Sequence, residues 1–285
     1  MNHQKVRLSP GLYFVATPIG TARDITLRAL DILASADVIA AEDTRSLRRL
    51  MEIHGVPLDG RRVLSYHDHS GGGSRDRLIA ALAEGQSVAY ASEAGMPLIA
   101  DPGYDLGKAA SDAGYLVTTA PGASAVLTAL TLAGLPTDAF FFAGFLPNAS
   151  TARKARLEVV RSIPGTLVFY ESPKRVAASL ADMALVLGAD RQAAMCRELT
   201  KKFEEVRRGT LAELAENLAN APVKGEIVLI IDRSRSAPVN NADVETDLRA
   251  ALETHSVKDA ADLVSKMHEI PRRTLYQMAL KLGKN

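Results

Sequence analysis

Three turns rich in glycine and proline lie in the first half of the chain, and they are well suited to hold a small ligand. They occupy residues 17–20, residues 92–97 with 101–103 close behind, and residues 121–125, each after a short apolar segment. Glycine lets the backbone approach a ligand closely, and proline holds a turn rigid. Ligands of open α/β sheets bind beside the loops at the carboxyl ends of strands. Any α/β protein needs some turns of this kind, but three such turns at three strand ends favour a ligand pocket built largely of backbone.

The sequence lacks the motifs of several kinds of binding or catalytic site. No strand is followed by the G-x-G-x-x-G of dinucleotide-binding proteins, and there is no P-loop. Cys and His residues lack zinc spacing, and no Ser or Cys stands in a nucleophile elbow. His67 and His69 flank Asp68, where a metal pair remains an alternative to ordinary polar residues at a strand end. The pattern favours an adenosyl-type ligand held by backbone and apolar contacts, without a metal.

Alternating strand and helix patterns position these turns. We expect strands at 12–16, 38–41, 63–66, 87–91 and 116–120, with helices at 24–34, 44–54, 75–83 and 104–113 between them. Strands separated by helices of about ten residues predict βαβ units and a mostly parallel sheet. Asp24 and Thr44 are expected to cap the first two helices.

A second α/β unit is expected to begin near Pro121. It should hold strands at 140–143, 166–170, 192–197, 203–209 and 226–231, and helices at 124–133, 151–161, 173–187 and 211–219. The short connection before residues 203–209 predicts an antiparallel pair, and therefore mixed pairing. Residues 232–242 are typical of a linker. Three short helices follow at 244–254, 258–269 and 272–282, for which plain packing is favoured over recognition of duplex DNA.

Composition narrows the class of protein. The 285 residues are 47% hydrophobic and 24% charged, as in globular domains. A single cysteine, Cys196, excludes an intramolecular disulfide and fits a reducing compartment. No secretory signal is visible and no apolar stretch approaches the roughly 20 residues of a membrane span, so we expect a cytoplasmic protein. With a net charge of +1, a nucleic-acid partner would need local basic patches.

A set of motifs runs in order through residues 11–231 and carries a resemblance. The most specific are Glu42-Asp43-Thr44-Arg45, Tyr170-Glu171-Ser172-Pro173 and Arg197-Glu198-Leu199-Thr200-Lys201. With these motifs the chain resembles the tetrapyrrole methylase superfamily and, within it, the bacterial 16S rRNA (cytidine-2′-O)-methyltransferase family. The tetrapyrrole enzymes of the superfamily lack that set. Where the family usually has Ser-Asp-Ala-Gly-Thr-Pro, this chain has Glu93 and Met96 in place of the Asp and the Thr.

The resemblance implies an α/β fold of two α/β domains of the tetrapyrrole methylase type, with S-adenosyl-L-methionine in the interdomain cleft, plus a small helical C-terminal tail. The expected boundaries are 1–121, 122–232 and 233–285. It also implies a homodimer that acts on 16S rRNA in the small ribosomal subunit, at the ribose of a cytidine in the decoding region. The residues implied to bind the cofactor are Pro18, Gly20, Ser92, Glu93, Ala94, Gly95, Pro97, Ser124, Ala125, Tyr170, Gly225, Glu226 and Ile227.

Methyl transfer to a ribose hydroxyl needs a group that orients the hydroxyl or accepts its proton, because the hydroxyl is a weak nucleophile. Candidates in the matched motifs are Glu42, Asp43, His67, Glu171, Glu198 and Lys201. The sequence cannot choose among them, and each could instead be a structural hydrogen-bonding group. We select Glu42, His67, Glu171 and Lys201 as the catalytic candidates.

Contact with RNA needs cations near the mouth of the cleft. Arg45, Arg175 and Lys201 lie in loop-end motifs, so we expect them to bind RNA. For residues 48–49 and 153–156 a solvated helix face is an equal alternative. Two rival functions remain: a tetrapyrrole C-methyltransferase, and a non-catalytic RNA-binding module of ribosome assembly, which the departure at Met96 slightly favours.

Overall fold

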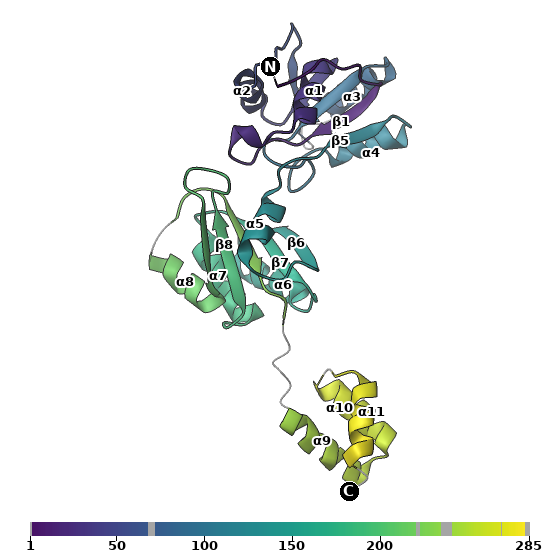
Figure 1. Cartoon of the computed structure of the whole chain (residues 1–285), viewed down its shortest axis with the longest axis vertical. Helices are drawn as coiled ribbons and strands as arrows, with labels where there is room; N and C mark the ends of the chain where they lie inside the picture. Colours follow the sequence, from purple (N-terminus) through teal and green to yellow (C-terminus); the bar gives the residue numbers. More distant parts are fainter. Residues whose placement is uncertain (1, 68–71, 221–222, 235–240, 269, 283–285) are drawn as a thin grey trace. The chain divides into compact units, whose positions relative to one another are not determined.

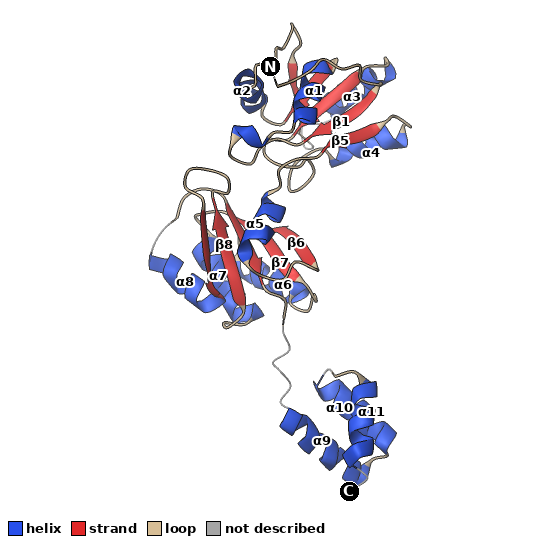
Figure 2. Ribbon diagram, viewed as in Figure 1, coloured by secondary structure: helices blue, strands red, loops and turns tan. Residues whose placement is uncertain are grey.

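The computed structural model describes residues 2–67, 72–220, 223–234, 241–268 and 270–282 (Figure 1). The contacts divide the chain into two compact units, residues 1–234 and 235–285. The first unit contains two separate five-stranded sheets, and the described residues of the second form three helices (Figure 2). The fold is therefore α/β with C-terminal helices, as the sequence predicted.

The first sheet is entirely parallel, with strand order β3-β2-β4-β1-β5. Its strands are β1 (Gly11–Val15), β2 (Val38–Ala41), β3 (Val63–Ser65), β4 (Ser87–Ala91) and β5 (Val117–Ala120). The helices are α1 (Leu27–Ser35), α2 (Thr44–Ile53), α3 (Gly72–Ala83) and α4 (Tyr104–Asp112). Both faces of β1 are buried: Tyr13 and Val15 pack with α1 and α2, whereas Leu12 and Phe14 pack with α3 and α4. A parallel sheet covered by helices on both faces needs such apolar runs.

The second sheet has mixed pairing and the strand order β6-β7-β10-β8-β9. Its strands are β6 (Phe140–Phe145), β7 (Thr166–Glu171), β8 (Gln192–Arg197), β9 (Glu205–Thr210) and β10 (Ile227–Ile231). Only β6 and β7 are parallel, and the predicted antiparallel pair of β8 and β9 is confirmed. Helix α5 (Ala125–Ala133) packs on one face; α6 (Ser150–Val160), α7 (Val176–Leu187) and α8 (Leu211–Asn220) pack on the other.

Several expected element ends were wrong, and for α1 and α2 the difference is one of capping. Helix α1 begins after Thr26, whose hydroxyl accepts a hydrogen bond from Ala29 N (3.1 Å), and Asp24 lies in the preceding 3₁₀ turn, Ala22–Asp24. Helix α2 is capped by Asp43 rather than Thr44. Helix α7 and strand β9 each begin later in the chain than the pattern predicted.

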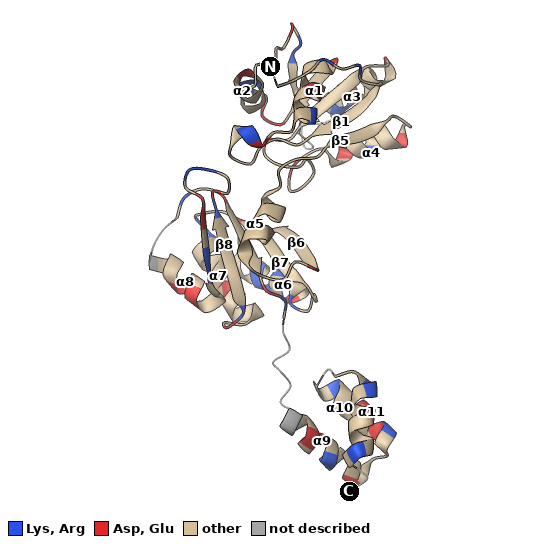
Figure 3. Ribbon diagram, in the orientation of Figure 1, with Lys and Arg blue, Asp and Glu red and all other residues tan. Residues whose placement is uncertain are grey.

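The second unit has its own apolar core. It contains α9 (Asn241–Thr254), α10 (Val257–His268) and α11 (Arg272–Leu282), which contribute Val244, Leu248, Val264 and Leu275 to that core. The three expected helices are thus present, while most of the expected linker lies outside the described residues. None of the helices in the described parts is long and apolar enough to cross a membrane. Charges of both signs are interspersed over both units (Figure 3).

Candidate functional site

The strand order brings the three predicted turns together. Strands β4, β1 and β5 are neighbours and parallel, so the turns that follow them leave the same edge of the sheet. Thr17 and Gly95 exchange two backbone hydrogen bonds of 3.0 Å each. The Thr17 hydroxyl lies 3.2 Å from Ser92 O, and Ser92 Oγ donates to Gly95 O (2.5 Å). Thr17, Ser92 and Gly95 therefore hold the shape of the turn.

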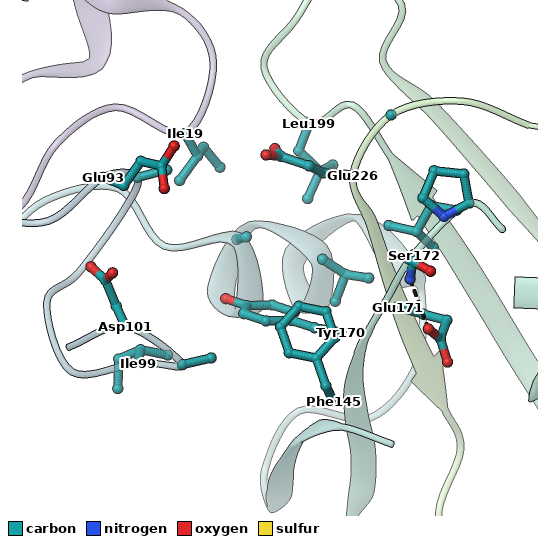
Figure 4. Close-up of a pocket in the computed structure, with 17 residues that line it drawn as sticks. Ile19, Glu93, Ile99, Asp101, Phe145, Tyr170, Glu171, Ser172, Leu199 and Glu226 are labelled. Carbon is teal, nitrogen blue, oxygen red and sulfur yellow. Dashed lines mark hydrogen bonds between the residues drawn. The ribbon is translucent and has the colours of Figure 1, made fainter. Parts of the chain in front are cut away.

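A cavity of about 420 Å³ lies beside these turns and takes its lining from both sheets of the first unit (Figure 4). The residues after β1 and β4 supply Ile19, Glu93, Ala94, Ile99, Ala100 and Asp101. Ala125, at the first position of α5, belongs to the third turn. The second sheet and its loops supply Phe145, Tyr170, Glu171, Ser172, Pro173, Leu199, Gly225, Glu226, Ile227 and Val228. Its size and its mixture of apolar walls with a few polar groups are those of a small-molecule site.

Two carboxyl groups with raised pKa values face this cavity (Figure 4). Burial, a hydrogen bond with Glu42 and the neighbouring negative charges raise the pKa of Asp101 to about 8. Glu93 keeps contact with solvent, yet partial desolvation and the charge of Glu42 raise its pKa as well. Asp101 Oδ2 is buried, and the side-chain partner that raises the pKa of this carboxyl is another acid, Glu42. A positively charged ligand group or a hydrogen-bond donor would satisfy these carboxyl groups.

The backbone around the cavity is strained. Leu98 and Ala100 have φ angles of +71° and +57°, and Glu198 and Thr200 have +50° and +62°. Such left-handed conformations are costly outside glycine, and they cluster at ligand sites. The structure thus holds two loops of the cavity wall, one after β4 and one after β8, in fixed unusual shapes.

Two glycines allow the loop after β8 to close against its neighbours. A Cβ at Gly20 would lie 2.6 Å from Thr200 Oγ1, and a Cβ at Gly225 would lie 2.4 Å from the Glu198 side chain. Thr21 N donates to Thr200 Oγ1 (3.1 Å), which ties this loop to the turn after β1. Gly20 and Gly225 are therefore required for close packing of the chain itself.

Lys201 is held as a charged group between two carboxylates. Its Nζ donates to Glu198 Oε1 (2.9 Å) and to Glu226 Oε2 (2.8 Å). Burial by itself would lower the pKa of Lys201, but these two hydrogen bonds raise the pKa above its usual value. A protonated lysine cannot accept a proton, so this geometry favours a structural role of Lys201 over a role as general base.

Glu171 and Arg175 form a partly buried ion pair. Arg175 Nε and Nη2 donate to Glu171 Oε1 (2.8 and 2.5 Å), and Ser179 Oγ donates to Oε2 (2.5 Å). The Glu171 side chain is only 1% exposed, and Arg175 also donates to Asn148 Oδ1. In Figure 4 the Glu171 carboxylate points away from the centre of the cavity. The arrangement favours a structural role for Glu171, and it leaves Arg175 less free to bind RNA.

Replacing Glu171 with Ala is expected to lower the free energy of unfolding by about 3 kcal/mol, because the Arg175 guanidinium and the Ser179 hydroxyl lose their common partner. Chemical denaturation measures the loss. Glu158→Ala is the matched control, since Glu158 pairs with Arg161 on the surface and should contribute at most about 1 kcal/mol. A Glu171→Ala protein as stable as the wild type but inactive would instead support the catalytic assignment.

Glu42 and His67 lie together near Asp101. His67 Nδ1 is 3.8 Å from Glu42 Oε1, and both side chains are partly exposed. His67 Nε2 lies 3.2 Å from Ser65 Oγ. Asp68 and His69 lie outside the described residues, and within the described ranges no three Asp, Glu, His or Cys side chains gather as metal ligands. Glu42 and His67 therefore form a loose pair that keeps contact with solvent, although Glu42 also hydrogen-bonds with Asp101.

The cavity contains part of the predicted cofactor set. The predicted residues that line it are Glu93, Ala94, Ala125, Tyr170, Gly225, Glu226 and Ile227. Gly95 and Pro97 belong to the same turn as the lining residues Glu93 and Ala94 but do not line the cavity themselves. Pro18, Gly20 and Ser92 border a neighbouring groove. Ser124 caps α5 through Leu127 N (3.4 Å) and lines a separate hollow.

Sequence reasoning missed several lining residues. They are Ile19, Ile99, Ala100, Asp101, Phe145, Ser172, Pro173, Leu199 and Val228. Ile19 and Asp101 lie in turns, at 17–20 and 101–103, that the sequence assigned to a ligand pocket, but neither was named as a cofactor residue. Nothing in the local sequence signals the aromatic contact of Phe145 with Tyr170, whose ring centroids are 5.5 Å apart.

Two family profiles match the chain. The profile of the Tetrapyrrole (Corrin/Porphyrin) Methylases matches residues 11–215. The profile of the RsmI C-terminal HTH domain matches residues 238–283. Together they span both units.

Solved structures with the same fold include a diphthine synthase, with a TM-score of 0.58 and 18% identity over 78% of this chain and 89% of that one. A uroporphyrin-III C-methyltransferase from Thermus thermophilus, solved with S-adenosyl homocysteine, has a TM-score of 0.54 and 19% identity over 78% and 97%. At this identity the likeness shows the fold alone.

Curated relatives match over nearly their whole length. The ribosomal RNA small subunit methyltransferase I of Mesorhizobium japonicum is 48% identical over 96% of this chain and 93% of the relative. The protein of the same name from Vibrio cholerae is 42% identical over 96% and 95%. The chain therefore belongs to the tetrapyrrole methylase family and, within it, to the family of ribosomal RNA small subunit methyltransferase I.

Proposed function

We propose that this protein uses S-adenosyl-L-methionine to methylate the ribose 2′-hydroxyl of a cytidine in the decoding region of 16S rRNA. The observation that carries the proposal is the cavity in which Glu93 and Asp101 face apolar and backbone walls. The names of the relatives support rRNA of the small subunit as substrate. The choice of the ribose oxygen rests on the family motifs at residues 42–45, 170–173 and 197–201.

The lining residues fit S-adenosyl-L-methionine. Ile19, Ala125 and Tyr170 offer apolar surface to an adenosyl group, within a volume of about 420 Å³. The desolvated Asp101 carboxyl, whose side-chain partner is another acid, and the nearby Glu93 suit a cationic centre. When bound, the cofactor supplies a methyl group on a positively charged sulfur.

The chain's own residues bind and orient the reactants. Holding the ribose oxygen in line with the methyl carbon and its sulfur lowers the barrier mainly through positioning. Among the four catalytic candidates, Lys201 and Glu171 are held in ion pairs of 2.9 Å or less, whereas Glu42 and His67 are 3.8 Å apart and both partly exposed. We assign the orientation of the 2′-hydroxyl and the acceptance of its proton to the Glu42–His67 pair.

Three further assignments belong to the same proposal. The chain works as a homodimer in the cytoplasm, and its partner is the small ribosomal subunit. The first unit divides into domains 1–121 and 122–232, with residues 233–285 as linker and helical tail. All three rest on the family resemblance, and the presence of two sheets in the first unit supports the division.

Methyl transfer to assembled subunits tests the function. Full-length protein is incubated with methyl-labelled cofactor and small subunits from a strain that lacks the enzyme, and the label is mapped by nuclease digestion. We expect label on the ribose oxygen of one cytidine, with excess S-adenosylhomocysteine as the inhibited control. Label on a base atom would refute the ribose assignment. No label on RNA while a precorrin is methylated would move the chain to the tetrapyrrole branch.

A further inference from the structure

A groove of about 550 Å³ lies next to the cofactor cavity. One wall is formed by Asp43 and the length of α2 as far as Ile53, and the other by residues 17–22 with Ser92 and Glu93. Glu93 lines both the groove and the cavity. A polymer that lies in the groove would therefore reach the mouth of the cavity at Glu93.

Two arginines one helical turn apart border this groove. Arg45 and Arg49 both line it, and residues at this spacing have Cβ atoms about 5–6 Å apart. This separation is comparable with that between neighbouring phosphates of a single strand. Arg48 lies on the same helix and is exposed, but it does not line the groove.

Both guanidinium groups can exchange their present partners for phosphate. The Arg45 side chain is 93% exposed, and its Nε lies 3.8 Å from Asp43, whose Oδ1 accepts hydrogen bonds from the backbone of Arg45 and Ser46. Arg49 pairs with Glu52, and both side chains are about 70% exposed. Surface pairs of this kind contribute little, so a phosphate can compete with them.

Apolar side chains complete the groove. Leu50 and Ile53 line it, and Ile53 is 52% exposed although it is a large aliphatic residue. Single-stranded nucleic acids combine phosphates that need cations with base faces that need a non-polar surface.

We propose that this groove binds the single-stranded RNA segment next to the methylated nucleotide, with Arg45 and Arg49 contacting its phosphates. The inference rests on the proposed function and adds the place where the polymer is held. It also separates Arg49 from Arg48, which the sequence treated as equivalent. Bound in this way, the strand delivers one nucleotide past Glu93 into the cavity.

Binding and kinetics of full-length variants test the groove. Arg45→Ala, Arg49→Ala and the double variant are compared with wild type and with Arg48→Ala as matched control, on small subunits that lack the methyl group. Each groove variant should raise the dissociation constant and KM for subunits roughly five- to tenfold, because one phosphate contact is lost. The double variant should also reduce the salt dependence of binding by about 1.4 in the log–log slope. Cofactor affinity and kcat should stay unchanged, and Arg45→Lys should recover part of the binding.

Two results would overturn the proposal. One is a double variant that binds subunits as tightly as Arg48→Ala does; the other is a kcat loss without any change in KM. Filter binding reports on the groove even if no methyl group reaches a ribose. Conversely, the methyl label could appear on a base atom while the groove variants still bind subunits more weakly than Arg48→Ala does. That result would refute the ribose assignment but support RNA binding by the groove.

Discussion

Replacing Gly95 with Val is expected to weaken binding of S-adenosyl-L-methionine by at least about 100-fold, because the variant adds backbone strain and side-chain overlap. Gly95 has a φ of +84°, where a β-branched residue is a genuine outlier. Its Cβ would lie 3.2 Å from Ile19 Cγ2 and 3.4 Å from Ala123 O, so even the first added carbon is crowded. The turn would lose its paired hydrogen bonds with Thr17, and the adjacent lining residues Glu93 and Ala94 would move.

Calorimetry with the full-length protein measures this effect. Gly114→Val is the matched control, because Gly114 has a similar φ of +78° but nothing within 4 Å of a Cβ, and it lies before β5, away from the turns. Gly114→Val should lose stability while keeping cofactor affinity. Met96→Thr, which restores the usual family residue, should bind as well as wild type or better. Normal cofactor binding by Gly95→Val would show that residues 92–97 are not the cofactor turn.

Replacing Asp101 with Asn is expected to remove most of the pH dependence of cofactor binding. Because the pKa of Asp101 is raised to about 8, this group is mainly protonated at pH 7. A cationic ligand favours the ionised form, so wild-type affinity should rise from pH 6 towards pH 9, by at most about tenfold per pH unit below the pKa. The groups that face Asp101 are Glu42, Glu93 and Tyr170, and the pKa of Tyr170 is itself raised by burial and by Glu226 and Asp101.

The proton released on binding is measured by calorimetry in two buffers that differ in ionisation enthalpy. Wild type should release protons at pH 7, whereas Asp101→Asn should release few. The control is Asp105→Asn, an exposed aspartate in the first turn of α4. S-adenosylhomocysteine, which lacks the positive sulfur, should release fewer protons than the cofactor. Wild-type binding that is constant from pH 6 to pH 9, without proton release, would contradict the prediction.

Without ligand, the raised pKa of Asp101 makes the free energy of unfolding fall as pH rises, whereas cofactor affinity rises over the same range. Asp101 ionises near its ordinary value of 3.8 in the unfolded chain but near 8 in the folded one. Between these values the unfolded state binds fewer protons, so this group lowers the free energy of unfolding as pH rises and has no further effect above about 8. Asp101→Asn should therefore be less sensitive to pH over that range.

Local sequence predicted most elements but not their ends. Apolar runs such as residues 12–16 and 227–231 are continuous and short, which is why the corresponding strands β1 and β10 were found. The start of α1 depended on which of Asp24 and Thr26 accepts the free N–H groups, and that choice is made by backbone geometry. Both residues are good caps, so sequence alone could not distinguish them.

By itself the sequence determined the order of strands and helices, the parallel first sheet, the mixed second sheet and the turns beside the site, because periodicity and Gly/Pro punctuation act over a few residues. Long-range packing makes β4, β1 and β5 neighbours, and so brings Thr17 into hydrogen bonding with Gly95, which lies far from it in sequence. It also decided that Glu171 and Lys201 are held in ion pairs and that Asp101 is desolvated next to Glu42. The ionisation and hydrogen bonding of these side chains depend on which groups the fold brings next to them and on how much water those groups exclude. A local sequence pattern cannot predict such neighbours.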